Sequence, residues 1–149
     1  LARFIRTMLK AMFNTLAGKK ICLLGFAFKA NTGDTRESPA IYIAKKLLAE
    51  KARVVISDPQ ALRNAAVDLQ DAEGQVRFIE DPYTAAAGCH ALAVMTEWEL
   101  YRELDFEKIY ETMLKPAFIF DGRNILDHRR CFDIGFNVYP IGSPPLTRF

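Results

Sequence analysis

The residues best suited to chemistry in this sequence lie in one polar stretch, residues 25–39, which directly follows a short apolar run. The stretch carries two cations and three hydroxyl groups, on Lys29, Arg36, Thr32, Thr35 and Ser38. The proline that ends it is typical of the first turn of a helix. Fixed cations and the free N–H groups of a helix start both attract anions, so this stretch suits a phosphate or a pyrophosphate.

The same stretch has a second interpretation that needs no ligand. Asp34 could pair with Arg36, and Lys29 with Glu37, as ordinary ion pairs of a solvated connecting loop. Ser38 would then simply cap the helix that begins after it. The residues alone leave both interpretations open.

A second candidate site is the run Phe-Asp-Gly-Arg-Asn at residues 120–124. Gly122 permits a sharp exit from a strand, and the guanidinium of Arg123 can bind a phosphate or a base carbonyl through two N–H groups. The alternative is that Arg123 pairs with Asp121 or Asp127 at the rim of the fold. Both interpretations again stay open.

The elements that must position these residues alternate between short apolar runs and helical patterns, which is typical of βαβ units. We predict strands over residues 20–25, 53–57, 76–79, 91–96, 117–120 and 136–141. We predict helices over residues 39–50, 60–69, 82–88, 101–113 and 125–132. The fold class is therefore α/β, with a doubly wound, mostly parallel, six-stranded Rossmann-like sheet. Ligands of such a sheet bind beyond the carboxyl ends of the strands, where both candidate sites fall.

The first loop departs from the pattern by which such sheets bind NAD. Only Gly25 stands in the place of the glycine-rich GxGxxG turn. Asp58 follows the second predicted strand, where a ribose-binding acid would lie, but without that turn it is better explained as a turn residue before Pro59. We therefore expect no conventional NAD site in this sheet.

The first residues show the 3–4 spacing of an amphipathic helix over residues 1–16, which Gly18 would end. No capping residue precedes it, so we expect the chain to begin in mid-helix, as a fragment of a longer protein. Its apolar face could pack on this domain, on another domain or on a second copy. We favour a contact with another domain or subunit. At the other end, residues 143–149 are expected to form a loose tail.

Composition excludes several classes of function. Lysine and arginine total 20 against 18 acids, so the sequence gives no sign of nucleic-acid binding. No apolar run approaches the ~20 residues of a membrane span and no signal-peptide pattern is present, so we expect a cytoplasmic protein.

We predict that Cys22, Cys89 and Cys131 are buried, reduced thiols, and that His128 belongs to an exposed basic turn and binds no metal. Glu97 and Trp98 could line a pocket, or the indole could cover the core.

The run GFAFKANTGDTRESP at residues 25–39 closely resembles the nucleotide-sugar loop of the UDP-glucose/GDP-mannose dehydrogenase family. Further matches follow in the same order: SDP at 57–59, DPY at 81–83, TEW at 96–98, KPAFIFDGR at 115–123 and a last strand near residue 136. Residues 1–18 are similar to the end of the family's long central helix, which builds its dimer contact. Residues 19–142 then correspond to its C-terminal UDP-sugar-binding domain.

The resemblance implies roles for individual residues. Phe28, Lys29 and Arg123 would contact the nucleotide sugar, and Arg36 would reach toward NAD held mainly by an absent N-terminal domain. The sequence is most similar to the UDP-glucose branch, whose reaction is the NAD-dependent oxidation of UDP-glucose to UDP-glucuronate through a cysteine thiohemiacetal.

None of the three cysteines matches the nucleophile of that reaction, so this chain alone would be inactive. The implied partners are UDP-glucose or UDP, the N-terminal domain and a second subunit. The alternatives are a GDP-mannose dehydrogenase domain and a free-standing nucleotide-binding module without redox activity.

Overall fold

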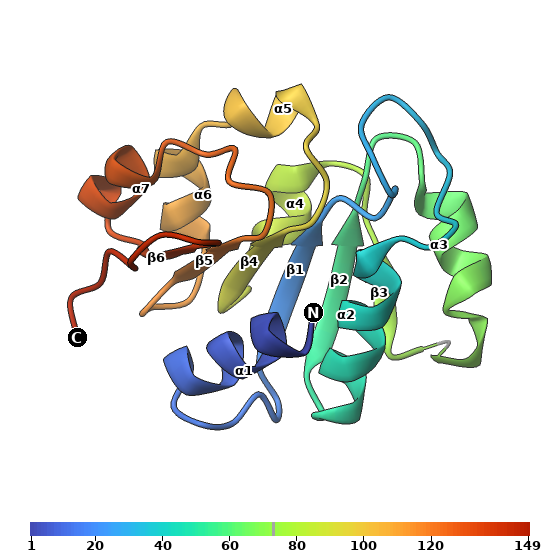
Figure 1. Cartoon of the computed structure of the whole chain (residues 1–149), viewed down its shortest axis with the longest axis horizontal. Coiled ribbons are helices and arrows are strands. Elements are labelled where there is room, and N and C mark those ends of the chain that lie inside the picture. Colours follow the sequence, from blue (N-terminus) through green and yellow to red (C-terminus); the bar gives the residue numbers. More distant parts are fainter. Residues whose placement is uncertain (73) are drawn as a thin grey trace.

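Within residues 1–72 and 74–149, which the computed structural model describes, six short strands form one parallel sheet (Figure 1). The strand order is β3-β2-β1-β4-β5-β6, the order of a doubly wound Rossmann sheet. The strands are β1 (Lys20–Leu24), β2 (Arg53–Ser57), β3 (Val76–Phe78), β4 (Ala91–Val94), β5 (Phe118–Asp121) and β6 (Asn137–Pro140). The predicted fold class is confirmed, and the predicted strand ends are in error by at most two residues.

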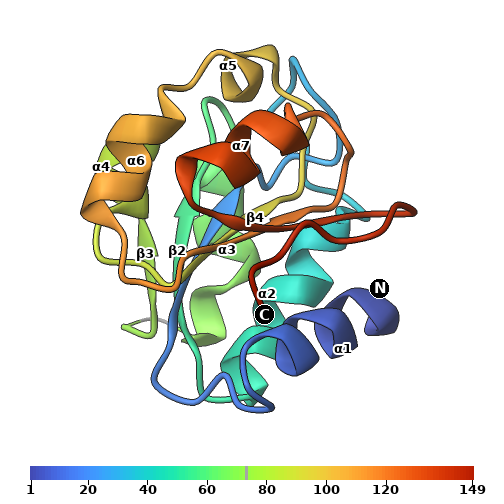
Figure 2. The same ribbon diagram turned by 90° about the vertical axis from the view of Figure 1, so that its left-hand side faces the viewer.

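Helices cover both faces of the sheet, and each face has its own core (Figure 2). Successive strand residues point to opposite faces, so Ile21 and Leu23 enter one core while Cys22 and Leu24 enter the other. The first core is closed by α1 (Ala2–Ala11), α2 (Pro39–Ala49) and α3 (Leu62–Asp68). The second is closed by α4 (Pro82–Ala86), α5 (Glu99–Arg102), α6 (Phe106–Thr112) and α7 (His128–Ile134).

The first helix is shorter than predicted. It ends at Ala11, whereas the periodicity predicted a helix over residues 1–16. Phe13 and Asn14 follow in the left-handed region, with φ of 67° and 65°. The Asn14 N–H donates to the carbonyl of Leu9 at 2.8 Å, which closes the helix before Gly18 is reached.

The apolar face of α1 packs on its own domain. Ile5, Met8 and Met12 are buried in the first core without any second chain. Most of this face is therefore covered by the domain itself, and not by the other subunit or domain that we favoured from the sequence. Leu1 and Phe13 remain more than half exposed.

Two further helix predictions were wrong in detail. The helix predicted over residues 101–113 is broken into α5 and α6, because Asp105 accepts a hydrogen bond from the N–H of Lys108 at 3.1 Å and starts a new helix. The helix predicted to start at Ile125 begins at His128.

Across residues 1–72 and 74–149, no helix combines the length and the apolarity that a membrane crossing requires.

The C-terminal segment, expected to be loose, is bound to the edge of the sheet. Leu146 and Val138 exchange two backbone hydrogen bonds of 2.9 Å, in an antiparallel bridge to β6. The guanidinium of Arg148 lies 4.0 Å from the centre of the Phe132 ring and donates to the carbonyl of Phe136 at 2.9 Å. This segment therefore pairs with part of an otherwise open strand edge.

The three cysteines are buried and free, as predicted. Burial raises the pKa of Cys89 to about 11 and that of Cys131 to about 12, and it raises the pKa of Cys22 well above its ordinary value. Because the thiolate is the reactive form, none of these thiols is prepared to act as a nucleophile.

Candidate functional site

Loops that follow β1, β2, β4 and β5 meet at the carboxyl edge of the sheet, at the top of Figure 1. Side-chain hydrogen bonds join these loops to one another. For example, the Thr96 hydroxyl, after β4, donates to the carbonyl of Ala27 at 2.7 Å. Gly25 lies so close to Thr96 that an added Cβ would come within 2.4 Å of its side chain. The two loops can approach this closely only because residue 25 is glycine.

Asp58, at the end of β2, is the first of two buried carboxylates that fix these loops. Its side chain lies in a site only 1% exposed and accepts hydrogen bonds of 2.7 to 3.2 Å. The donors are the backbone N–H groups of Phe26, Ala27, Gln60 and Ala61 and the indole N–H of Trp98. The predicted structural role of Asp58 is confirmed, and its oxygens are already engaged where an NAD fold would offer an acid to the ribose.

Asp121, at the end of β5, is the second buried carboxylate and is 0% exposed. It accepts hydrogen bonds of 2.9 to 3.1 Å from the backbone N–H groups of Arg123, Asn124, Ile125 and Leu126. Nε2 of His128 lies 2.8 Å from it. The expectation that His128 belongs to an exposed basic turn is therefore wrong, because its ring helps to satisfy this carboxylate.

Phe28 and Lys29 lie exposed at the tip of the first loop. Phe28 is 40% exposed, and the Lys29 ammonium lies 5.5 Å from the centre of its ring. The N–H of Phe28 donates to the carbonyl of Asp34 at 3.0 Å, which folds the tip back on its own loop. An aromatic face and a cation are thus presented together to solvent.

Arg36 follows the ligand-free interpretation, since its guanidinium pairs with Asp34 at 2.7 Å. Its side chain is 88% exposed. The hydrogen bond from Arg36 and its charge lower the pKa of the Asp34 carboxyl to about 2. The structure gives no contact between Arg36 and either Lys29 or Arg123, so Arg36 is presented separately from the other candidate residues.

The rest of the first loop is anchored to α3 and α2. The Asn64 amide donates to the carbonyl of Gly33 at 2.6 Å, and the buried Thr35 hydroxyl donates to Asp68 at 2.6 Å. Ser38 accepts from the N–H of Ala40 at 3.2 Å and caps α2 as predicted. Thr35 and Ser38 are therefore structural residues, and the hydroxyls that suggested phosphate binding are largely used within the fold.

Arg123 is joined to the first loop through Glu97. The guanidinium of Arg123 forms an ion pair with Glu97, and not with Asp121 or Asp127 as the ligand-free interpretation supposed. The other carboxylate oxygen of Glu97 accepts from the N–H of Ala30 at 3.0 Å. Glu97 thereby brings the two predicted binding segments together. Trp98 is 6% exposed and covers the core, which was the second of its two interpretations.

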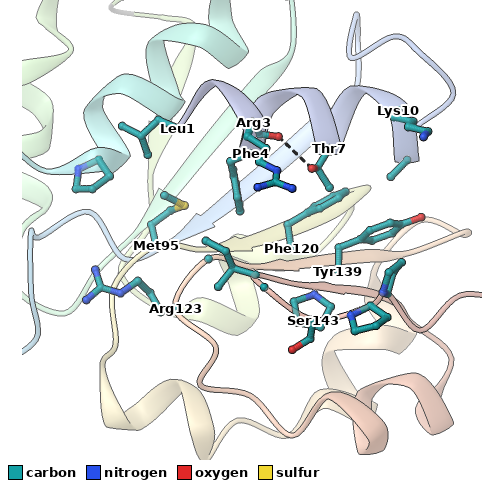
Figure 3. A pocket seen from close by; sticks show the side chains of 18 of the residues that line it. Leu1, Arg3, Phe4, Thr7, Lys10, Met95, Phe120, Arg123, Tyr139 and Ser143 are labelled. Carbon is teal, nitrogen blue, oxygen red and sulfur yellow. Dashed lines mark hydrogen bonds between the residues drawn. The ribbon is translucent and has the colours of Figure 1, made fainter.

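A groove of about 1210 Å³ extends from Arg123 between α1 and strands β5 and β6 (Figure 3). Arg123 and Met95 lie at one end of it, and Tyr139 and Lys10 at the other. Its floor is aromatic, with the rings of Phe120 and Tyr139 stacked at 5.2 Å. Phe28, Lys29 and Arg36 do not line this groove. The sequence signal that could have indicated it is the alternation of aromatic residues along β5, at Phe118 and Phe120.

Comparison with known proteins identifies the family. A family model described as the UDP-binding domain of the UDP-glucose/GDP-mannose dehydrogenase family matches residues 22–128, which is more than half of the chain. The chain belongs to this family. The resemblance inferred from the loop at residues 25–39 is thus confirmed.

Individual relatives agree with the family match. The chain is 47% identical to UDP-glucose 6-dehydrogenase 1 of Arabidopsis thaliana over 95% of this chain and 34% of that protein. It is 48% identical to UDP-glucose 6-dehydrogenase of Rattus norvegicus, over 95% of this chain and 31% of that protein. The structure of a UDP-glucose dehydrogenase from Pyrobaculum islandicum superimposes with a TM-score of 0.71 at 27% identity, over 90% of this chain and 29% of the other. The chain therefore spans about a third of the length of the relatives it matches.

We predict that replacing Asp58 by alanine strongly destabilises the domain. The substitution leaves four backbone N–H groups and one indole N–H without their acceptor, so the free energy of unfolding should fall by about 3 kcal/mol or more. Urea unfolding followed by circular dichroism measures the change. The matched control is Asp133→Ala, which removes an exposed carboxylate paired with Arg129 and should cost less than about 1 kcal/mol. A similar loss in both variants would contradict the anchoring role of Asp58.

We also predict the titration of the first loop. Because Arg36 depresses the pKa of folded Asp34 to about 2 from the ordinary value of 3.8, the pair should be intact above pH 4 and be lost as the pH falls through about 2. Carboxyl chemical shifts measured by NMR should show this midpoint. Arg36→Gln should raise the pKa toward 3.8, whereas Lys29→Ala, which removes a smaller and more distant influence, should move it little. An Asp34 midpoint that stays near 2 in Arg36→Gln would show that the pair does not exist in solution.

Proposed function

We propose that this chain binds the nucleotide of UDP-glucose as the C-terminal domain of an NAD-dependent UDP-glucose 6-dehydrogenase. The observation that carries the proposal is that the segments bearing Lys29 and Arg123 are linked through Glu97 at the carboxyl edge of the sheet. Its support from comparison is the match to a UDP-binding domain and the identity to UDP-glucose 6-dehydrogenases.

The geometry suits a nucleoside diphosphate. Lys29 offers a mobile point charge, and Arg123 offers a planar fork of N–H groups that matches phosphate oxygens. Phe28 adds an exposed apolar ring next to the ammonium group of Lys29. We assign these three residues to contacts with the nucleotide sugar.

This sheet lacks the features that bind NAD, whereas Arg36 is exposed to a ligand held by another domain. The first loop lacks a glycine-rich turn, and the acid at the end of β2 is fully engaged with N–H donors of its own fold. Arg36 extends outward with 88% of its side chain exposed, where a group held by another domain can reach it. We propose that NAD is held mainly by the N-terminal domain of the whole protein and that Arg36 touches it from this side.

The oxidation itself is assigned to the rest of the protein. UDP-glucose becomes UDP-glucuronate by loss of four electrons to two NAD with addition of one water, and the family's route passes through a cysteine thiohemiacetal. Cys22, Cys89 and Cys131 are buried with raised pKa values, so none can supply the thiolate. This chain therefore positions the nucleotide and is inactive on its own.

The proposed partners follow from the same assignment. They are the N-terminal domain of the same polypeptide and at least one further copy, which would meet the exposed side chains of Leu1 and Phe13 beside α1. We propose a cytoplasmic location, where the nucleotide sugar and NAD are both available.

Calorimetry of the chain with UDP, UDP-glucose, GDP-mannose and NAD tests the proposal. UDP and UDP-glucose should bind more tightly than the other two. Lys29→Ala and Arg123→Ala should each weaken UDP binding by about 10- to 150-fold, the value of one charge-assisted hydrogen bond. Lys45→Ala and Arg129→Ala, which remove exposed cations from α2 and α7, should leave it unchanged.

Three results would contradict the proposal. Tighter binding of NAD than of UDP would assign the sheet to the cofactor. Tighter binding of GDP-mannose would place the chain in the other branch of the family. Unchanged UDP affinity in both Lys29→Ala and Arg123→Ala would show that the nucleotide binds elsewhere.

A further inference from the structure

We propose that Glu97 is a positioning residue for nucleotide binding, which holds Arg123 and the first loop in the arrangement that a diphosphate requires. The inference rests on the proposed function, because it assumes that Arg123 contacts the ligand. It goes further by assigning a role to an acidic residue beside an anion site. Such a residue would ordinarily be expected to oppose binding.

The two oxygens of the Glu97 carboxylate contact different segments, one through a hydrogen bond and the other through an ion pair. Oε1 accepts from the N–H of Ala30, at the base of the loop tip that carries Lys29, and Oε2 pairs with the Arg123 guanidinium. The three residues come from loops after β1, β4 and β5, and 67 residues separate Ala30 from Glu97. One carboxylate therefore cross-links the two loops that the proposed site uses.

The backbone on either side of Glu97 is held firmly. Thr96 is 0% exposed and its hydroxyl donates to the carbonyl of Ala27 at 2.7 Å. Trp98 is 6% exposed and its indole N–H donates to Asp58 at 3.2 Å. A residue between two such anchors has a restrained backbone, and the Ala30 N–H holds its carboxylate, so Arg123 can be oriented against it.

Among the residues that the structure describes, Glu97 is the acidic side chain that pairs with Arg123. Asp121 lies close by, but it is saturated by backbone N–H groups and His128, and its contact with Arg123 is to the backbone. A free arginine side chain would lose several rotamers on binding an anion, and an arginine already held by Glu97 loses fewer. The guanidinium has five N–H groups, so pairing with Glu97 leaves others for phosphate oxygens.

The charge of Glu97 does not cancel this benefit. Oε2 is removed from water, but it lies against the Arg123 guanidinium, whose positive charge offsets the repulsion between the carboxylate and a bound phosphate. The orientation of Arg123 and the anchoring of the loop at Ala30 remain as benefits of the same carboxylate. We therefore expect removal of Glu97 to weaken binding.

A double-mutant cycle measured by UDP calorimetry tests the role. Glu97→Ala should weaken UDP binding by about tenfold in the otherwise unchanged chain, and by about threefold or less when Arg123 is already alanine, because coupled residues are not additive. Glu97→Gln keeps an oxygen for the Ala30 N–H and loses the charge, so its UDP affinity should lie between that of the unchanged chain and that of Glu97→Ala. The matched control Glu99→Ala removes an exposed glutamate that pairs with Arg102 on α5, and it should have no effect.

A second measurement separates this role from simple destabilisation and from the proposed function. In the UDP-free chain, NMR signals of the Ala30 amide and the Arg123 Nε–Hε group should move together in Glu97→Ala and stay in place in Glu99→Ala. Urea unfolding reports any general loss of stability.

The possible outcomes have separate meanings. If Glu97→Ala binds UDP as tightly as the unchanged chain or more tightly, while Arg123→Ala binds weakly, the positioning role is wrong and the proposed function stands. If Glu97→Ala weakens UDP binding equally in both Arg123 backgrounds, or if the two NMR signals do not move, Glu97 has no specific coupling to Arg123. If neither Lys29→Ala nor Arg123→Ala changes UDP affinity, the proposed function itself fails, and the positioning role fails with it.

Discussion

The arrangement of the site depends on two buried carboxylates that are stabilised by hydrogen bonds, mainly from backbone N–H groups. Asp58 and Asp121 lie at the ends of β2 and β5, where they are almost fully removed from water. A buried charge without partners would cost many kcal/mol, so each must gather N–H donors. Most of the donors lie in the loop that follows each carboxylate, and Asp58 also gathers donors from the loops after β1 and β4. The requirement to satisfy the two carboxylates therefore fixes the paths of those loops.

This constraint explains why the fold resembles a dinucleotide-binding sheet and yet presents a different site. Asp58, at the end of β2, accepts hydrogen bonds from backbone N–H groups of the first loop, and this loop follows a long path in place of a tight glycine turn. Its cations extend outward, and Arg123 approaches from the loop that Asp121 holds. The two buried acids of this carboxyl edge are satisfied within the fold, while Lys29, Arg36 and Arg123 keep N–H groups that a ligand can reach, which favours an anion such as a diphosphate.

Much of the fold was accessible from the sequence, because its signals are local. Apolar runs separated by helical patterns predicted the six strands, and Ser38 before a proline predicted the start of α2. The failures involve contacts between distant residues or unusual backbone. The periodicity of α1 could not show that Phe13 and Asn14 turn left-handed, and no local pattern links Glu97 with Ala30 and Arg123. The candidate residues could be identified by type, whereas their partners could not.

A crystal structure of the chain with UDP is the most direct test of the central claim, that anchored loops at the carboxyl edge present Lys29 and Arg123 to one nucleotide. The account predicts phosphate oxygens within hydrogen-bonding distance of both cations, with Asp58 and Asp121 still accepting their backbone N–H groups. It would be contradicted by UDP bound in the aromatic groove between α1 and β6 without contact to Lys29. It would also be contradicted by loops that release either carboxylate when the nucleotide binds.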